Sequence, residues 1–353
     1  MRPLILITMG DPAGVGPEIA VKALSDPGLY DRCVPVVVGA PEPLRQAAAL
    51  LDTPLSFRRL THPAQALGRP GTVEYLCPDG LETARFVPGI VSGACGEAAF
   101  TCITTAIRLA LQREADAVAT APINKEALHL SGHAFAGHTE IFAHYTGSTR
   151  YAMLLIAGSL RVIHCTTHVS MRQACDLITR ERVLSVIRLG HTACSRILRR
   201  PPRIAVAGLN PHCSENGLFG DEEARAIAPA VADAQKDGIL AEGPLPPDTV
   251  FVKAACGQYD LVVAMYHDQG HIPIKLMGFH MDEKTGAFSQ MSGVNVTVGL
   301  PIIRTSVDHG TAFDRAGQNR ANPQSMTEAI LLAADMAEGR RHEQALETGR
   351  SGG

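Results

Sequence analysis

The 353-residue chain contains no tryptophan, and aromatic residues make up only 5% of a sequence that is 46% hydrophobic. Its core must therefore consist mainly of Ala, Val, Leu and Ile, which suits helices packed on sheets. A formal net charge of −3 gives no positive surplus for binding nucleic acid. The sequence also lacks an apolar run of about 18 residues and a basic segment ahead of a hydrophobic one at its start. We therefore expect a cytoplasmic α/β protein with neither a nucleic-acid nor a membrane partner.

Two common site motifs are also missing. The nine cysteines are scattered without a CxxC pair, which favours buried free thiols over a disulfide framework or a zinc site. The glycine-rich segment after the first predicted strand, Thr8–Ile19, does not have the GxGxxG spacing of a dinucleotide fingerprint. It is interpreted as a loop between a strand and a helix, where Gly10, Gly14 and Gly16 let the backbone approach a ligand closely.

Several apolar runs end in polar clusters, as buried parallel strands do at their carboxyl ends. The clearest is Leu261–Met265, which leads into a predicted polar loop at Tyr266–His271. Ligands of open α/β sheets bind at this edge. Three predicted strands lead in this way to His168, His212 and His267. Three neutral imidazoles with an open coordination position could form a catalytic site for zinc or a similar divalent ion, provided that the fold brings them together.

Two further segments have both a structural and a functional interpretation. Gly137–Glu140 is predicted to begin a helix with Thr139 as its N-cap, and the backbone N–H groups behind it would suit an anion. Gly243–Thr249 is predicted to be a rigid turn presenting Asp248, which either caps the following helix or faces a site. The residues alone leave both interpretations open.

The chain closely resembles the 4-hydroxythreonine-4-phosphate dehydrogenase family of vitamin B6 biosynthesis. The matching motifs extend from residue 8 to about residue 317: TMGDPAGVGPEI, APINKEAL, GHTEIF, TTHVSMR, GLNPHCSENG, GPLPPDT, AMYHDQGHIPIK and GVNVTVGLPIIRTSVDHGTAFDRAG. The run DHGTAFDRAGQNRANP is also similar to the isopropylmalate and isocitrate dehydrogenases. The resemblance implies two α/β/α domains with a cleft between them, 1–127 plus 302–353 on the cofactor side and 128–301 on the metal and dimer-interface side.

The resemblance also implies a role for individual residues. One divalent ion (Zn, Mg, Co or Mn) is expected on His168, His212 and His267, in active sites shared between the subunits of a homodimer. The expected substrate contacts are His138, Thr139, Lys275, Asn295 and Arg304. Lys275, paired with Asp248, is our hypothesis for proton transfer, since a desolvated lysine loses its proton more readily.

NAD or NADP is expected along two glycine-containing segments and one asparagine: Gly10, Gly14, Gly16, His309, Gly310, Thr311, Ala312 and Asn322. Both cofactors stay open, because no acidic residue is placed by a motif to bind the ribose 2′-hydroxyl.

The implied reaction is oxidation, with decarboxylation, of a phosphorylated 3-hydroxy acid, with 4-phosphooxy-L-threonine as the first choice. SENGLFGDEE is more similar to the branch that acts on D-threonate or D-erythronate 4-phosphate, and HMDEKTGAFSQMS is an insertion between Phe279 and Gly293. An aromatic dihydrodiol dicarboxylate is another possible substrate class. Outside the dehydrogenases, the alternatives are a phosphoacyl transferase, which would need no three-histidine metal site, and a non-enzymatic module that binds metal or phosphate.

Overall fold

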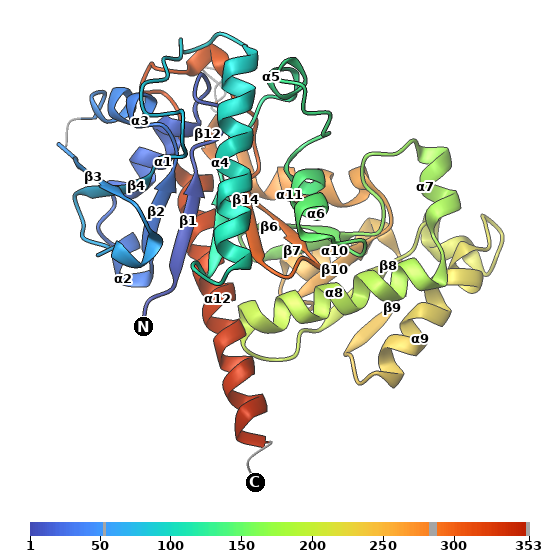
Figure 1. Ribbon diagram of the computed structural model, residues 1–353. Helices are drawn as coiled ribbons and strands as arrows, with labels where there is room; N and C mark the ends of the chain where they lie inside the picture. Colours follow the sequence, from blue (N-terminus) through green and yellow to red (C-terminus); the bar gives the residue numbers. More distant parts are fainter. Residues whose placement is uncertain (52–53, 282–287, 351–353) are drawn as a thin grey trace. The chain divides into compact units, whose positions relative to one another are not determined.

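The structure is a computed structural model that describes residues 1–51, 54–281 and 288–350 (Figure 1). Two compact units are described separately below: Met1–Thr149 with Leu300–Glu338, and Arg150–Gly299 with Gly339–Gly353. The predicted division after residue 127 differs from these units, in which residues 128–149 lie with the first. Helices α5 (Lys125–Leu130) and α6 (His138–Thr146) both pack against α4 (Gly93–Leu111), and this packing places the segment there.

The first unit contains a parallel sheet with the strand order β3-β4-β2-β1-β5-β14. Its strands are Leu4–Thr8 (β1), Val34–Val38 (β2), Ser56–Leu60 (β3), Thr72–Leu76 (β4), Ala117–Thr120 (β5) and Ile303–Val307 (β14). The other helices of this unit are Gly16–Leu24 (α1), Leu29–Arg32 (α2), Pro41–Ala48 (α3) and the start of Gln324–Arg350 (α12). Because the strands are parallel, their carboxyl ends share one edge, where the segments after β1 and β14 meet.

Helix α4 is long and apolar enough to cross a membrane by length and composition, yet 61% of the window that passes this test is buried inside the protein. Its start is capped by Ser92, whose Oγ accepts a hydrogen bond from Cys95 N. Buried side chains recur every three or four residues, including Cys95, Ala99, Cys102, Ile103 and Ala106. Helix α4 thus packs as a core helix of the first unit.

The second unit contains a mixed sheet with the strand order β13-β6-β7-β10-β8-β9. Its strands are Ala152–Ala157 (β6), Leu160–His164 (β7), Ile204–Ala207 (β8), Ala241–Leu245 (β9), Leu261–Ala264 (β10) and Val294–Val298 (β13). Its helices are Met171–Leu177 (α7), Arg180–Leu198 (α8), Ala228–Lys236 (α9), Pro247–Ala255 (α10) and His267–Gly278 (α11). Strands β7, β10 and β8 are adjacent and parallel, so their carboxyl ends share one edge.

The insertion predicted after Phe279 contributes a short antiparallel pair, Phe279–Met281 (β11) and Phe288–Met291 (β12). Its central residues, 282–287, lie outside the described part of the chain. All nine cysteines are free, as predicted, and several are buried. Burial raises the pKa of the Cys165 and Cys194 thiols to about 12, which makes them poor nucleophiles.

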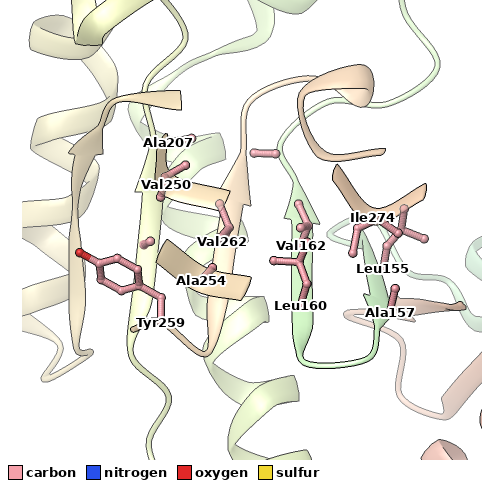
Figure 2. Close-up of a cluster of buried hydrophobic side chains, with 12 residues drawn as sticks. Leu155, Ala157, Leu160, Val162, Ala207, Val250, Ala254, Tyr259, Val262 and Ile274 are labelled. Carbon is pink, nitrogen blue, oxygen red and sulfur yellow. The ribbon is translucent and has the colours of Figure 1, made fainter. Parts of the chain in front are cut away.

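A hydrophobic cluster holds α10 and α11 on the sheet of the second unit (Figure 2). Val250 and Ala254 of α10 and Ile274 of α11 pack against strand residues such as Leu160 and Val162, and all five side chains are at most 2% exposed. Helix α11 carries His267, His271 and Lys275. The cluster therefore fixes the position of the helix from which these side chains project. The predicted α/β class is confirmed in both units.

Replacing Leu160 with alanine should lower the free energy of unfolding by about 2–5 kcal/mol, because it leaves a cavity beneath α11. Leu160 is 1% exposed, whereas Leu240 of the same unit is 56% exposed. The matched Leu240→Ala change should alter stability by less than about 0.5 kcal/mol. Urea unfolding of both variants measures the difference, and equal midpoints would show that the cluster does not support the unit.

Candidate functional site

Hydrogen bonds join the segments that follow the carboxyl ends of strands β7, β10 and β8. Thr166 Oγ1 donates a hydrogen bond of 2.9 Å to Met265 O, which ties the segment after β7 to the segment after β10. Gln269, which is buried, accepts from Met265 N at 2.7 Å and donates to Gly208 O at 2.8 Å. Gln269 thus links the segment after β10 to the segment after β8. These bonds hold together the segments that lead to the three predicted metal ligands.

Four histidine rings follow one another at this edge of the sheet. His168 and His267 have ring centroids 5.7 Å apart, His267 and His271 stack at 3.6 Å, and His271 lies 4.7 Å from His164. The predicted loop at Tyr266–His271 is wrong, because α11 begins at His267. Residues four apart on a helix lie on the same face, and this places His271 against His267.

His164 is the most deeply buried member of this row. Burial, together with the nearby His271 and His267, lowers its pKa to about 3, so the ring is neutral at physiological pH. Its Nδ1 lies 3.2 Å from Met153 O, and its Nε2 is buried without a hydrogen-bond partner among the described residues. Gly270 makes room for this ring, since a Cβ there would lie 2.3 Å from His164 Nε2. Sequence reasoning missed both His164 and His271, although the i, i+4 spacing of His267 and His271 was a usable signal.

His212 lies in a left-handed turn that its sequence did not predict. Residues 212–216 all have positive φ angles between 47° and 64°, although none is glycine. Left-handed backbone costs roughly 1–2 kcal/mol for each such residue. Buried Glu223 holds the preceding segment, since its Oε1 accepts from Leu209 N and Asn210 N, both at 2.8 Å.

The predicted metal set is therefore only partly assembled. His168 and His267 lie close to each other, whereas His212 Nδ1 lies 2.9 Å from Glu215 Oε1. Within residues 1–51, 54–281 and 288–350, no group of three His, Cys, Asp or Glu side chains is close enough to hold a metal ion. His168 and His267 supply two imidazole rings, and a metal ion bound there would need a third ligand.

The two residues of the predicted proton-transfer pair lie on different helices of the second unit, Lys275 on α11 and Asp248 on α10. Lys275, on α11, places its Nζ 4.2 Å from the centroid of the Phe279 ring, a cation–π arrangement. Asp248 is exposed in the first turn of α10, where its charge acts on the Cys213 thiol. In the same unit, Asn295 of β13 has a buried Oδ1 without a hydrogen-bond partner in the described structure. That oxygen is available to accept a hydrogen bond from a ligand.

The first unit holds a buried cation among the predicted substrate residues. Arg304 of β14 is 2% exposed, donates from Nη2 to Thr120 Oγ1 at 2.8 Å, and lies 5.5 Å from the Phe142 ring centroid. Burial lowers the pKa of the Arg304 guanidinium to about 9 and outweighs the opposing effect of Glu140, yet the group stays charged at neutral pH. Phe142 and Glu140 both belong to α6.

His138 lies beside this cation at the start of α6. Its pKa is lowered well below 6.5, mainly by burial and further by the charge of Arg304, so the ring is neutral. Its Nε2 is buried and has no hydrogen-bond partner in the described chain. The predicted N-cap at Thr139 is wrong, because Gly137 occupies that position without a side-chain cap and Thr139 lies within the helix. The helix start therefore presents backbone N–H groups near Arg304, which suits an anion.

The predicted cofactor segments meet at the carboxyl edge of the first sheet. Val15 N donates to Thr311 O at 2.9 Å, and a Cβ on Gly14 would lie 2.9 Å from the same oxygen. Gly10 has a φ of 72°, and a Cβ on Gly16 would lie 2.2 Å from Met9 O. This close backbone packing explains the glycines of the loop.

The rest of the predicted cofactor set lies on the segments after β14. Ala312 has a left-handed φ of 42°, and His309 Nδ1 lies 2.9 Å from Gly310 O. Asn322 Oδ1 accepts from Gln324 N at 2.8 Å at the start of α12. Ala321 N donates to Glu18 Oε1 at 2.9 Å, which ties this segment to α1 behind the glycine loop.

Asp11, within the same glycine loop, is a buried acid that the sequence did not single out. It is 1% exposed, its Oδ1 accepts from Ala13 N at 2.9 Å, and its Oδ2 has no hydrogen-bond partner in the described residues. Burial outweighs the backbone hydrogen bonds from Ala13 and Gly14 and raises its pKa to about 6. A raised pKa means that the folded protein binds this proton more tightly than the unfolded chain does.

The contribution of Asp11 to stability should be complete below about pH 4 and should be lost as the pH rises through about 6. An Asp11→Asn variant cannot ionise, so between pH 4 and pH 7 its stability should rise relative to the native protein by about 3 kcal/mol. Urea unfolding across this range measures the change, with the exposed Asp31→Asn as control. Parallel pH profiles for the native protein and Asp11→Asn would contradict the burial argument.

Comparison with known proteins identifies the family. The profile described as "Pyridoxal phosphate biosynthetic protein PdxA" matches residues 31–333. The D-threonate 4-phosphate dehydrogenase of Salmonella typhimurium is 48% identical over 334 residues, 94% of this chain and 98% of that protein. The 4-hydroxythreonine-4-phosphate dehydrogenase of Geobacter metallireducens is 48% identical over 336 residues, 95% of this chain and 96% of that one.

A solved structure supports the same conclusion. The 4-hydroxythreonine-4-phosphate dehydrogenase of Klebsiella pneumoniae has a TM-score of 0.81 and 48% identity, and the match covers 95% of this chain and 100% of that one. The predicted resemblance is thus confirmed, and with it the predicted enzyme class, a dehydrogenase. The chain belongs to the family of the pyridoxal phosphate biosynthetic protein PdxA.

Proposed function

We propose that this protein is a metal-dependent, NAD(P)-linked dehydrogenase that oxidises the 3-hydroxyl of a four-carbon acid phosphorylated at its 4-position, with loss of CO₂. Two substrates fit this description, 4-phosphooxy-L-threonine and D-threonate 4-phosphate, and they differ only in the group on carbon 2. Relatives of nearly the same identity are named for each of them. 4-Phosphooxy-L-threonine remains our first choice, and D-threonate 4-phosphate is the alternative.

The observation that carries this proposal is the buried guanidinium of Arg304. Its burial lowers its pKa to about 9, so the fold disfavours the charged form more than Glu140 favours it. An anionic ligand would offset this cost through a charge-assisted, bidentate hydrogen bond. The neighbouring start of α6 and the neutral His138 extend the same site toward a phosphate or a carboxylate. The substrate class that fits is therefore an anion with hydrogen-bonding groups, such as a phosphorylated hydroxy acid.

The second unit carries bases and hydrogen-bonding groups of its own. Oxidation of a 3-hydroxyl needs a group that accepts its proton while hydride passes to the nicotinamide. We assign that role to Lys275, and we assign to Asn295 Oδ1, which has no hydrogen-bond partner in the described residues, the acceptance of a hydrogen bond from the substrate. The contacts of Asp248 give no support to the pairing with Lys275. A divalent ion held by histidines of this unit would supply Lewis-acid polarisation of the alcohol and charge stabilisation during the loss of CO₂.

We propose that the ion (Zn, Mg, Co or Mn) binds His168 and His267 and that His212 completes the set in a cytoplasmic homodimer. An exposed apolar surface on and after α11 supports a second copy of the chain as the partner: Ile272 is 58% exposed, Leu276 75% and Met281 58%. Apolar side chains so exposed along one helix commonly mark an interface.

Substrate oxidation is tested with both phosphorylated acids, a divalent ion and NAD or NADP, by the appearance of reduced cofactor. Arg304→Met should lower kcat/KM by about 100-fold or more, since a buried charge partner of the substrate is lost. The exposed Arg69→Met of the same unit is the matched control and should be unchanged. If the native enzyme reduces no cofactor with either acid, or Arg304→Met remains fully active, the proposal is wrong.

Metal dependence is tested by chelation. Treatment with a chelator should abolish cofactor reduction, and a divalent ion should restore it. His168→Ala, His212→Ala and His267→Ala should each lower metal content at equilibrium, measured by elemental analysis, because each removes one proposed ligand. His62→Ala, remote in sequence and half exposed at its side chain, should retain the metal. Normal metal content in His212→Ala would remove that residue from the site.

A further inference from the structure

An aromatic cluster in the first unit packs against α4 beside helix α6. The ring of Phe100, on α4, stacks on the His133 ring with centroids 3.5 Å apart and an interplanar angle of 16°. The Phe135 and Tyr145 rings lie 6.0 and 5.9 Å from the Phe100 ring. His133 and Phe135 precede α6, whereas Tyr145 lies in its last turn. Phe100 thus packs against the chain both before α6 and at its end.

Polar contacts also hold His133 in place. Its Nε2 lies 2.8 Å from Glu97 Oε2, and because an ionised carboxylate only accepts hydrogen bonds, this ring nitrogen is the donor. Its backbone N donates to Leu128 O of α5 at 2.9 Å. Glu97 and Phe100 are three residues apart on α4, so the carboxylate and the ring lie side by side and contact His133 together. His133 is therefore bound to α4 through its ring and to α5 through its backbone.

The segment after His133 leads directly to the anion site proposed above. Residues 134–137, AFAG, contain no polar side chain, and Gly137 caps α6 without a side-chain hydrogen bond. His133 is therefore the last residue before α6 whose side chain makes a hydrogen bond. His138 begins α6 and lies beside Arg304, whose charge acts on its ring. A shift of the segment before α6 would move both this ring and the backbone N–H groups of the helix start relative to Arg304.

We propose that His133 is a positioning residue: its contacts with Glu97 and Phe100 hold the segment before α6 so that the anion site beside Arg304 is preorganised for its ligand. The inference rests on the proposed dehydrogenase function and deepens it. A site whose groups are already in place binds more tightly than one that must be ordered on binding, and a misplacement of about 1 Å can cost roughly 100-fold. The proposed proton acceptor and metal ligands belong to the second unit, so the effect of losing His133 appears in substrate binding and not in turnover.

The test measures kcat and KM for whichever of the two phosphorylated acids the enzyme oxidises, together with the dissociation constant of that acid by isothermal titration with the divalent ion but without NAD or NADP. His133→Ala should raise KM and the dissociation constant by about 10-fold and leave kcat within about 2-fold of the native value. Glu97→Ala removes only the polar contact and should raise both constants by about 3-fold. His133→Phe keeps a ring against Phe100 and should recover part of the affinity that His133→Ala loses. His129→Ala, an exposed histidine four residues earlier, should match the native enzyme.

A further variant separates positioning from a general loss of stability. Ile107→Val removes one buried methyl group from α4, two turns beyond Phe100, and it should lower the midpoint of urea unfolding but leave KM unchanged. Unchanged KM and dissociation constants in folded His133→Ala and Glu97→Ala, a loss confined to kcat, or an equal rise of KM in Ile107→Val would overturn the role of His133 and leave the dehydrogenase proposal standing. If the native enzyme neither binds nor oxidises either acid, the dehydrogenase proposal itself falls, and this inference falls with it.

Discussion

Burial of the Arg304 guanidinium is the constraint on which the functional account depends. Burying a charged group costs free energy unless hydrogen bonds and an opposite charge compensate for the lost hydration. Thr120 Oγ1 accepts a hydrogen bond from the guanidinium, and burial lowers the pKa of Arg304 more than Glu140 raises it. The central parallel sheet holds the cation in place through β14, and α6 covers it with a neutral histidine and a helix start. An anionic ligand would add a charge-assisted hydrogen bond to this buried cation.

The second unit carries groups that bind a cation rather than an anion. Its parallel strands β7, β10 and β8 lead to imidazole rings, whose nitrogen lone pairs can bind a cation. The burial that keeps His164 neutral, with a pKa of about 3, leaves its Nε2 without a hydrogen-bond partner among the described residues. The strained turn at His212, fixed from behind by Glu223, is the kind of local backbone strain that collects at functional sites. The two units thus carry complementary chemistry, a positive charge in one and electron-pair donors in the other.

Much of the fold and of the candidate site could be predicted from the sequence, because apolar runs that end in polar residues mark the ends of buried strands. Apolar runs such as Leu261–Met265 marked the buried strands, and parallel strands end at a common edge whatever their separation in the chain. The start of α11 was missed because Gly270 and Pro273 lower helix propensity, and the fold requires the glycine for the His164 ring. The N-cap at Gly137 was missed because a glycine without a side-chain cap gives no chemical signal.

Other features depend on contacts that no local pattern contains. Glu18 Oε1 accepts a hydrogen bond from Ala321 N across 303 positions in the chain, so the sequence could not predict this contact. The left-handed turn that carries His212, and the bonds of Glu223 that hold the segment before it, likewise have no local sequence signal. Family resemblance supplied the expected role of His212, whereas the structure supplied its surroundings.

The most direct test of the central claim is a crystal structure of the metal-loaded enzyme with 4-phosphooxy-L-threonine or D-threonate 4-phosphate bound. The account predicts that a phosphate or carboxylate oxygen of the ligand lies within hydrogen-bond distance of the Arg304 guanidinium, beside His138. A ligand whose anionic groups all bind elsewhere, with Arg304 contacting protein atoms alone, would contradict it.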